Sequence, residues 1–131
     1  MKLLLDTHIW LWSHLDPGRI GKRLTQHLQD PANELWLSPI SLWEFLLLVA
    51  KGRLSIEEDP DDWITASLAE APMYEAPLNH RVALSTRTIK VAHEDPADRF
   101  LAATAAVYDL TLATADERLL AGRGYRTFAN R

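Results

Sequence analysis

The chain has 131 residues, 47% of them hydrophobic, which is the size and composition of one folded domain rather than of a disordered segment. It contains no cysteine, and this excludes disulfide bonds, thiolate metal sites and thiol nucleophiles. Its 14 basic and 18 acidic residues give a net charge of −4, which argues against a protein that binds nucleic acid tightly by charge alone.

Strands and helices are predicted to alternate along the chain. Residues 3–5 form a continuous apolar run, typical of a strand covered on both faces, and a short helix through Trp10 and Trp12 ends near Pro17. The other predicted strands are residues 35–37, 74–76, 110–113 and 125–128. The other predicted helices are residues 18–29, 40–51, 60–71, 79–89, 96–108 and 114–120. This alternation predicts a single α/β domain, residues 1–131, with a mostly parallel sheet.

Several helix ends are marked by their residues. The helix at 40–51 is apolar on almost every side, so we predict that it is buried. Gly52 is suited to end that helix in a left-handed conformation. In the pairs Asp59-Pro60 and Asp95-Pro96, the aspartate would cap a helix and the proline would take its first position.

Four acidic residues stand in apolar or helix-starting sequence: Asp6, Glu44, Asp98 and Asp116. Between Lys2 and Asp16, Asp6 is the only Asp, Glu, Lys or Arg, and Glu44 is the only one between Glu34 and Lys51. Burying an ionised carboxylate is unfavourable unless a positive group meets it, and no Lys or Arg is local to either residue. We therefore expect the acids to converge and share a divalent cation.

The predicted elements support this convergence. Asp6 ends the first strand and Asp116 follows the strand at 110–113, and ligands of open α/β sheets gather beyond the carboxyl ends of the strands. Asp98 and Glu44 each share a helical face with apolar residues, so both are predicted to point inward. Crowded carboxylates raise one another's pKa, and a hard cation such as Mg²⁺, which binds carboxylates, waters and substrate phosphates, removes that conflict.

Helix capping is the alternative interpretation of these acids. Asp95 is a natural cap with Asp98 in the first turn, and Asp116 lies in the first turn of a helix whose start resembles a capping box. A second such box, Ser41-x-x-Glu44, is also present, although Ser38-Pro39 is an equally good start for that helix. Capping explains Asp6 poorly, because it ends a strand, and it does not explain why Glu44 faces core positions. The two interpretations stay open for the other acids.

Other polar side chains are candidates for weaker roles. Arg99 and Arg118 are candidates for contacts with a phosphate backbone, with solvent-facing arginine as the alternative. Thr7 and Thr114 could bond to the carboxylates, to a metal-bound water or to the substrate backbone, with backbone capping as the alternative. The histidines His8, His14 and His93 have no metal-binding spacing, and the five tryptophans fit a core or a protein interface better than base stacking.

The chain carries no sign of export or membrane insertion. MKLLLDTHIWLW does not resemble a signal peptide, because Asp6 interrupts its apolar stretch and no small-residue cleavage site follows. No apolar run is long enough to cross a membrane. We therefore expect a cytoplasmic protein with no membrane partner.

Four segments carry a resemblance to a known family: LLLDTHIWLW, SLWEFLLLVAKGRL, DPADRFLAATA and LATADERL. In this order and spacing they resemble the motifs of the PIN-domain ribonucleases, specifically the VapC-type toxins of bacterial toxin–antitoxin pairs. The resemblance implies a three-layer α/β/α sandwich with a mostly parallel central sheet. It implies endonucleolytic cleavage of RNA that depends on Mg²⁺, with Mn²⁺ as a substitute. The family's acids correspond to Asp6, Glu44, Asp98 and Asp116 as catalytic metal ligands, with Asp95 as a further candidate.

The resemblance also implies partners. These are an RNA substrate, a second copy of the chain in a homodimer, and a small antitoxin whose C-terminal segment crosses the active-site groove. Any contact with DNA would be made through the antitoxin. Relatives often carry a lysine one helical turn after the glutamate, where this chain has Leu48, so a phosphate contact from that position is not expected.

Two other functions are compatible with part of the sequence. A receiver-like domain would accept a phosphoryl group on Asp6, although the chain has no lysine after Lys90 to hold that group. A catalytically silent PIN-like module would serve only to bind a protein, although none of the expected acids is missing. The sequence does not identify the RNA target, the number of metal ions, the choice between Mg²⁺ and Mn²⁺, or the antitoxin and its stoichiometry.

Overall fold

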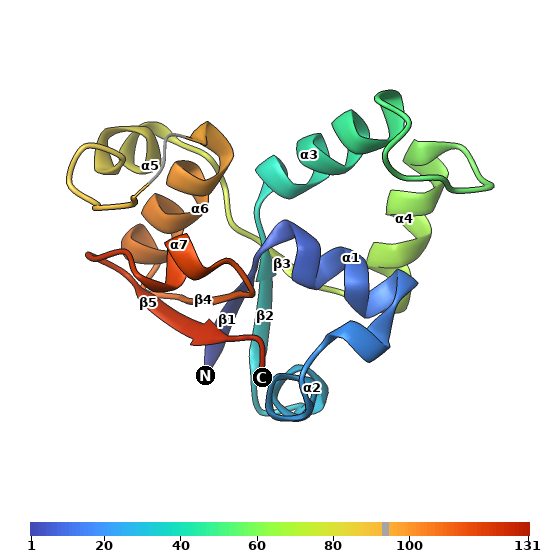
Figure 1. Ribbon diagram of the computed structural model, residues 1–131, viewed down its shortest axis with the longest axis horizontal. Helices are drawn as coiled ribbons and strands as arrows, with labels where there is room; N and C mark the ends of the chain where they lie inside the picture. Colours follow the sequence, from blue (N-terminus) through green and yellow to red (C-terminus); the bar gives the residue numbers. More distant parts are fainter. Residues whose placement is uncertain (93–94) are drawn as a thin grey trace.

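The computed structural model describes residues 1–92 and 95–131, so His93 lies outside the described residues. A five-stranded sheet in the order β3-β2-β1-β4-β5 forms its centre, and every neighbouring pair of strands is parallel. The strands are β1 (Lys2–Leu5), β2 (Glu34–Leu37), β3 (Tyr74–Glu75), β4 (Thr111–Thr114) and β5 (Arg126–Ala129). The predicted parallel sheet is confirmed, with β1 as its central strand (Figure 1).

Helices cover both faces of this sheet, which gives the expected α/β/α sandwich. The helices are α1 (Thr7–Leu15), α2 (Lys22–Gln29), α3 (Pro39–Ala50), α4 (Pro60–Glu70), α5 (His80–Ser85), α6 (Pro96–Val107) and α7 (Glu117–Leu120), with a 3₁₀ turn η1 (Pro17–Arg19) before α2. In Figure 1, α1, α2 and α4 lie on one side of the sheet and α5, α6 and α7 on the other. In the part of the chain that the structure describes, no helix has the length and apolar character needed to span a bilayer.

The strand order does not support the receiver-like alternative. Receiver domains have the order 2-1-3-4-5, with the first strand second from the edge. Here β1 lies between β2 and β4, with two strands on either side of it. The phospho-accepting function therefore loses the structural context on which it depended.

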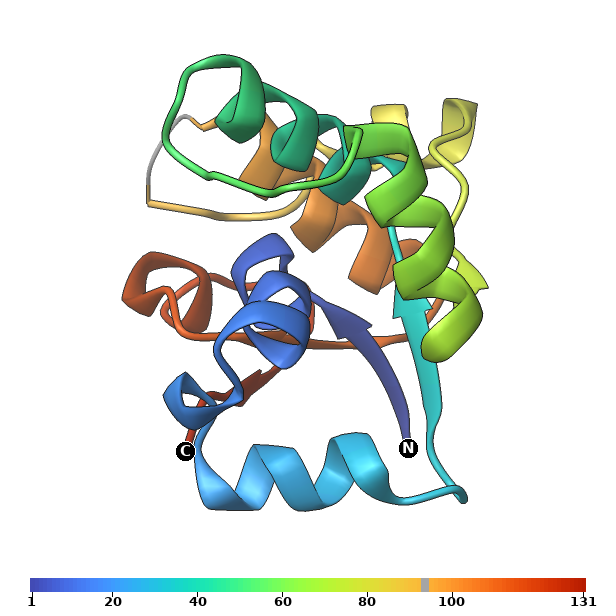
Figure 2. The ribbon, with the colours of Figure 1, turned by 90° about the vertical axis from the view of Figure 1, so that its right-hand side faces the viewer.

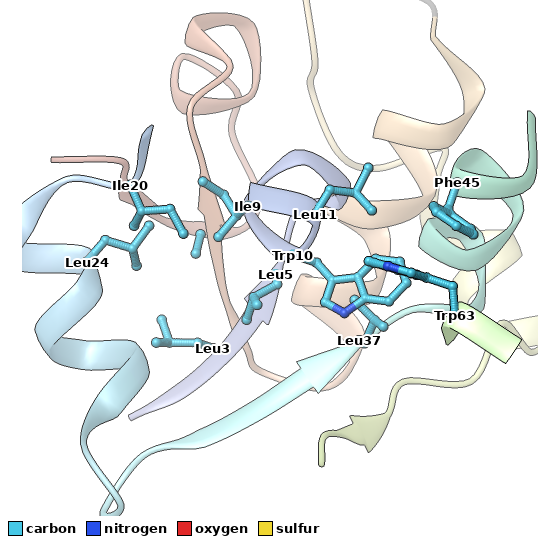
Figure 3. Close-up of a cluster of buried hydrophobic side chains, with 11 residues drawn as sticks. Leu3, Leu5, Ile9, Trp10, Leu11, Ile20, Leu24, Leu37, Phe45 and Trp63 are labelled. Atoms are coloured by element: carbon cyan, nitrogen blue, oxygen red, sulfur yellow. The ribbon is translucent and has the colours of Figure 1, made fainter. Parts of the chain in front are cut away.

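Alternation of side chains along β1 divides the hydrophobic core into two clusters. Leu3 and Leu5 belong to the cluster beneath α1 and α2, together with Trp10 and Trp63, whose ring centroids are 5.6 Å apart (Figure 3). Leu4 packs in the other cluster, against α6. The continuous apolar run of β1 is thus explained by its two covered faces, as predicted.

The prediction that the helix at 40–51 is buried is wrong. Of the 12 residues of α3, Ser41 and Phe45 are buried, whereas Trp43 is 52% exposed and Leu46 is 38% exposed. The helix continues directly from β2 and lies beyond the carboxyl ends of the strands, not on a face of the sheet (Figures 1 and 2). Only the sides that meet neighbouring helices are therefore covered, and an apolar flank stays open.

The helix predicted at residues 18–29 is also shorter than expected, because α2 begins at Lys22. Gly21 before it has an extended backbone, with φ −63° and ψ 157°. Its N–H donates to Asn130 Oδ1 over 2.7 Å, so the chain is held in a non-helical path by a residue from the far end of the sequence.

Other helix boundaries follow from local capping. Asp59 and Asp95 accept hydrogen bonds from backbone N–H groups two residues on, as predicted. Gly52 ends α3 with φ +70°, the left-handed conformation that glycine adopts readily. The helix predicted at 114–120 begins only at Glu117, because β4 extends one residue further than predicted.

Candidate functional site

The structure brings the predicted acids together at the carboxyl end of the sheet. They come from the end of β1, the middle of α3, the first turn of α6 and the residue that caps α7. One open cavity of about 480 Å³ is lined by Asp6, His8, Trp12, Arg19, Glu44, Asp95, Asp98, Ala115 and Asp116. Residues more than 100 positions apart in the sequence therefore share one polar site.

Asp6 is positioned by the pairing of β1 with β4. Its N–H donates to Ala113 O over 2.9 Å, and its side chain is buried, with 6% exposed. The Thr114 hydroxyl donates to Asp6 Oδ2 over 2.6 Å and accepts from Asp116 N over 3.0 Å. Burial raises the pKa of Asp6, and the Thr114 bond lowers it in part. Thr114 thus links two of the four acids and supports the ionised form of one.

Glu44 has a similar hydroxyl support from α1. Thr7 Oγ1 lies 2.5 Å from Glu44 Oε1 and 2.9 Å from Ser41 Oγ, and its single hydrogen is best donated to the carboxylate. Burial raises the pKa of Glu44, the Thr7 bond lowers it, and the charges of Asp6 and Asp95 raise it. The capping box proposed for Ser41 and Glu44 does not form, because Ser38 caps α3 instead.

Asp98 lies among the other acids of the site, and their charges act on it. It lies in the first turn of α6 and is 8% exposed. Burial, followed by the charges of Asp6, Asp95, Asp116 and Glu44, raises the pKa of Asp98 to about 7. Its carboxyl group is therefore divided between the protonated and ionised forms near neutral pH.

Capping and cavity lining are not alternatives for two of the acids. Asp95 accepts from Ala97 N over 3.0 Å at the start of α6, and Asp116 accepts from Arg118 N over 2.8 Å at the start of α7. Both residues also line the acidic cavity. A helix N-terminus favours negative charge, so the same two carboxylates cap a helix and face the site.

The donor set fits a hard divalent cation. Its atoms are carboxylate oxygens, and mutual repulsion contributes to the raised pKa of Asp6, Glu44 and Asp98. Within residues 1–92 and 95–131, no three His, Asp or Glu side chains are already arranged to hold a metal ion directly. Mg²⁺ keeps several waters and uses one or two carboxylates, so coordination partly through water matches this arrangement.

Two arginines predicted to contact substrate are not among the described residues that line the acidic cavity. Arg99 donates to Thr86 O over 2.6 Å and lines a separate cavity with Lys90 and Arg123. Arg118 is not among the described residues that line the acidic cavity. The arginine that does line it is Arg19, which sequence analysis missed because it was assigned to a helix. The dipeptide Pro17-Gly18 just before it is the local signal of a turn.

The link made by Thr114 gives a testable stability effect. We expect Thr114→Val to lower the free energy of unfolding by about 1–3 kcal/mol at pH 8, because the buried Asp6 carboxyl group loses its hydroxyl donor and Asp116 N loses its acceptor. Thr114→Ser keeps the hydroxyl and should stay close to wild type. Urea denaturation in a chelating buffer measures both. Equal losses for the valine and serine variants would contradict the role of this hydroxyl.

Comparison with known proteins places these features in a family. A model of the PIN domain matches residues 3–123. Ribonuclease VapC22 from Mycobacterium tuberculosis is 30% identical over 122 residues, which cover 92% of each chain.

Solved structures share the fold. FitAcB from Neisseria gonorrhoeae superposes with a TM-score of 0.64 at 25% identity and covers 96% of each chain. VapBC2 from Rickettsia felis, bound to a DNA fragment from its promoter, superposes with a TM-score of 0.70 and covers 98% of each chain. Because its identity is 16%, this second likeness is a likeness of fold alone.

Proposed function

This chain belongs to the PIN-domain family, and on that premise we propose that it is a metal-dependent endoribonuclease that acts as the toxin of a toxin–antitoxin pair. The observation that carries the proposal is the meeting of Asp6, Glu44, Asp98 and Asp116 in one open cavity. The curated relative is named as a ribonuclease. A carboxylate cluster open to solvent suits the hydrolysis of phosphodiesters, in which negative charge on the substrate must be met by a cation.

In this proposal Asp6, Glu44 and Asp98 hold Mg²⁺, or Mn²⁺ in its place, directly or through water. Asp116 completes the set or holds a second ion, and Asp95 is a further candidate ligand. When bound, the cation supplies an activated water and stabilises negative charge on the phosphoryl group. The chain itself orients the carboxylates, through Thr114 on Asp6 and Thr7 on Glu44. These two threonines therefore position the acids, and direct contact with the RNA backbone is not needed to explain them.

The proposal includes partners. Two solved structures of similar fold are complexes described as VapBC bound to DNA, so we propose a small antitoxin that covers the acidic cavity and makes any DNA contact. We also propose a homodimer in the cytoplasm. Sedimentation of the purified chain, alone and with the protein encoded beside it, tests both assemblies.

The test of the activity is cleavage of RNA by the purified chain. We expect cleavage with Mg²⁺ or Mn²⁺, none with EDTA, and recovery when the metal is restored. Folded Asp6→Asn protein is the matched inactive control, since it retains the size of the side chain and removes its charge. Full cleavage by Asp6→Asn would overturn the assignment of the site. No cleavage by the wild type under any metal would favour the silent protein-binding module.

A further inference from the structure

One wall of the acidic cavity is built from flat side chains rather than carboxylates. Trp12 lies one helical turn after His8 on α1, with ring centroids 5.8 Å apart. The guanidinium carbon of Arg19 lies 4.3 Å from the centroid of the Trp12 ring. All three residues line the cavity that contains the acids. An arginine is thus held against an aromatic face at the edge of the proposed catalytic site.

The backbone that carries Arg19 is held by the C-terminus of the chain. Asn130 Nδ2 donates to Arg19 O over 3.0 Å, and Asn130 Oδ1 accepts from Gly21 N over 2.7 Å. Leu24 N donates to Arg131 O over 2.9 Å. A Cβ atom at Gly21 would lie 1.9 Å from the carbonyl carbon of Arg131, so the close approach requires glycine. The C-terminus lies beside the start of α2, where these contacts form (Figure 2).

Two hydrogen bonds from one side chain therefore fix the residues on both sides of Ile20. Ile20 is itself buried in the core cluster beneath α1. The turn that bears Arg19 is therefore held by three contacts. Ile20 packs in the core, Asn130 bonds to the backbone, and the Trp12 ring contacts the guanidinium. Arg19 is thus an exposed residue whose backbone and guanidinium both have contacts that hold them in place.

The chemistry of Arg19 fits an anionic ligand. In the described ranges its guanidinium makes no salt bridge with a carboxylate within 4 Å, although acids share the cavity. Stacking on an indole covers one face of a guanidinium and leaves its N–H groups free to donate. Those N–H groups match the paired oxygens of a phosphate. Trp12 is half-buried and the arginine covers one face of its ring, so that face is closed to a stacking base.

We propose that Arg19 binds a non-bridging phosphate oxygen of single-stranded RNA next to the bond that is cleaved, with Trp12 and Asn130 as the residues that position it. This inference rests on the proposed ribonuclease function. It assigns to Arg19 the backbone contact that the sequence suggested for Arg99 and Arg118. The competing interpretation is that Arg19 only compensates the negative charge of the carboxylates.

The test compares Arg19→Gln with Arg23→Gln. Arg23 is a matched control, because its guanidinium lies 5.8 Å from the Phe128 ring and outside the acidic cavity. Binding of a short fluorescent RNA is measured in the Asp6→Asn background, so that the readout does not require cleavage. We expect Arg19→Gln to weaken RNA binding roughly 10- to 100-fold, the range for loss of one charge-assisted contact, and Arg23→Gln to change it less than about 3-fold.

A set of RNAs with one neutral methylphosphonate at successive positions identifies the contact. The methylphosphonate at one position should weaken RNA binding by the protein that retains Arg19 and have no effect on RNA binding by Arg19→Gln. Asn130→Ala should weaken binding when Arg19 is present and have no further effect in Arg19→Gln. A purely structural role for Asn130 would instead give equal effects in both backgrounds, and this would overturn the positioning assignment.

Metal titration distinguishes phosphate binding by Arg19 from the competing interpretation, in which Arg19 only compensates charge. If Arg19 only compensates charge, Arg19→Gln should bind Mg²⁺ or Mn²⁺ more tightly and leave RNA affinity unchanged, and this result would overturn the proposal. Failure of the wild type to cleave any RNA would count against the proposed function alone, since the binding comparison of Arg19 and Arg23 would still give its own answer.

Discussion

Asp98→Asn is expected to lower the rate of RNA cleavage by about 100- to 1000-fold and at the same time to make the metal-free protein more stable. The raised pKa of Asp98, about 7, means that its ionised form is disfavoured in the folded state by burial and by the neighbouring acids. The amide has the same shape and no charge, so the repulsion is removed. Each pKa unit corresponds to about 1.4 kcal/mol, and screening in an open cavity reduces the gain to about 1–2 kcal/mol, or roughly 3–8 °C in Tm.

The loss of activity has a different origin. The charge that destabilises the folded protein is the charge that would hold a cation, and loss of one such electrostatic contact lowers a rate by about 100- to 1000-fold. Activity and stability are therefore expected to move in opposite directions. Substitution of an acid with a purely structural role would instead lower the stability, and any loss of activity would follow from that lower stability.

Thermal unfolding in EDTA at pH 8 and RNA cleavage in Mg²⁺ measure the two effects. Asp109→Asn is the control, because Asp109 is exposed and pairs only with the exposed Arg126 among the described residues. Its φ of +55° is a conformation that asparagine also tolerates. This control should change the free energy of unfolding by less than about 0.5 kcal/mol. A destabilised or fully active Asp98→Asn protein would contradict the proposed role.

The site was predictable from sequence to the extent that burial and charge are local. Asp6 and Glu44 stand in apolar surroundings without a local cation, and both are found in the cavity. The positions of Asp98 at a helix start and of Asp116 after a strand were also predictable, because helix capping and strand termination depend on neighbouring residues.

What sequence analysis missed depends on contacts between distant residues. The turn that carries Arg19 is set by Asn130, 111 positions away, and no local pattern encodes such a contact. The exposed flank of α3, with Trp43 and Leu46, was missed for a related reason. Apolar residues on every side of a helix predict burial only when the fold covers every side, and α3 lies beyond the sheet.

A divalent cation is expected to stabilise the protein much more at pH 8 than at pH 5. Burial raises the pKa values of Asp6, Glu44 and Asp98 above their ordinary values, so between those values the folded state binds more protons than the unfolded state. The stability of the metal-free protein is therefore greatest below about pH 4 as far as these groups are concerned, and it falls as pH rises through about 7. A cation replaces the protons and restores this lost stability at high pH, whereas at pH 5 it must compete with them.

Urea denaturation at pH 5, 6, 7 and 8, in EDTA and in millimolar Mg²⁺ or Mn²⁺, measures this linkage. His14 contributes with the opposite sign, because burial lowers its pKa and favours the folded state as its proton is lost. Comparison with Asp98→Asn removes that background, since His14 is common to both proteins. In EDTA, the free energy of unfolding of the variant should fall less between pH 5 and 8 than that of the wild type. The cation should also stabilise the variant less. If wild type and variant gave the same pH slope, with equal stabilisation by metal at every pH, the carboxylates would not act as a shared cation site.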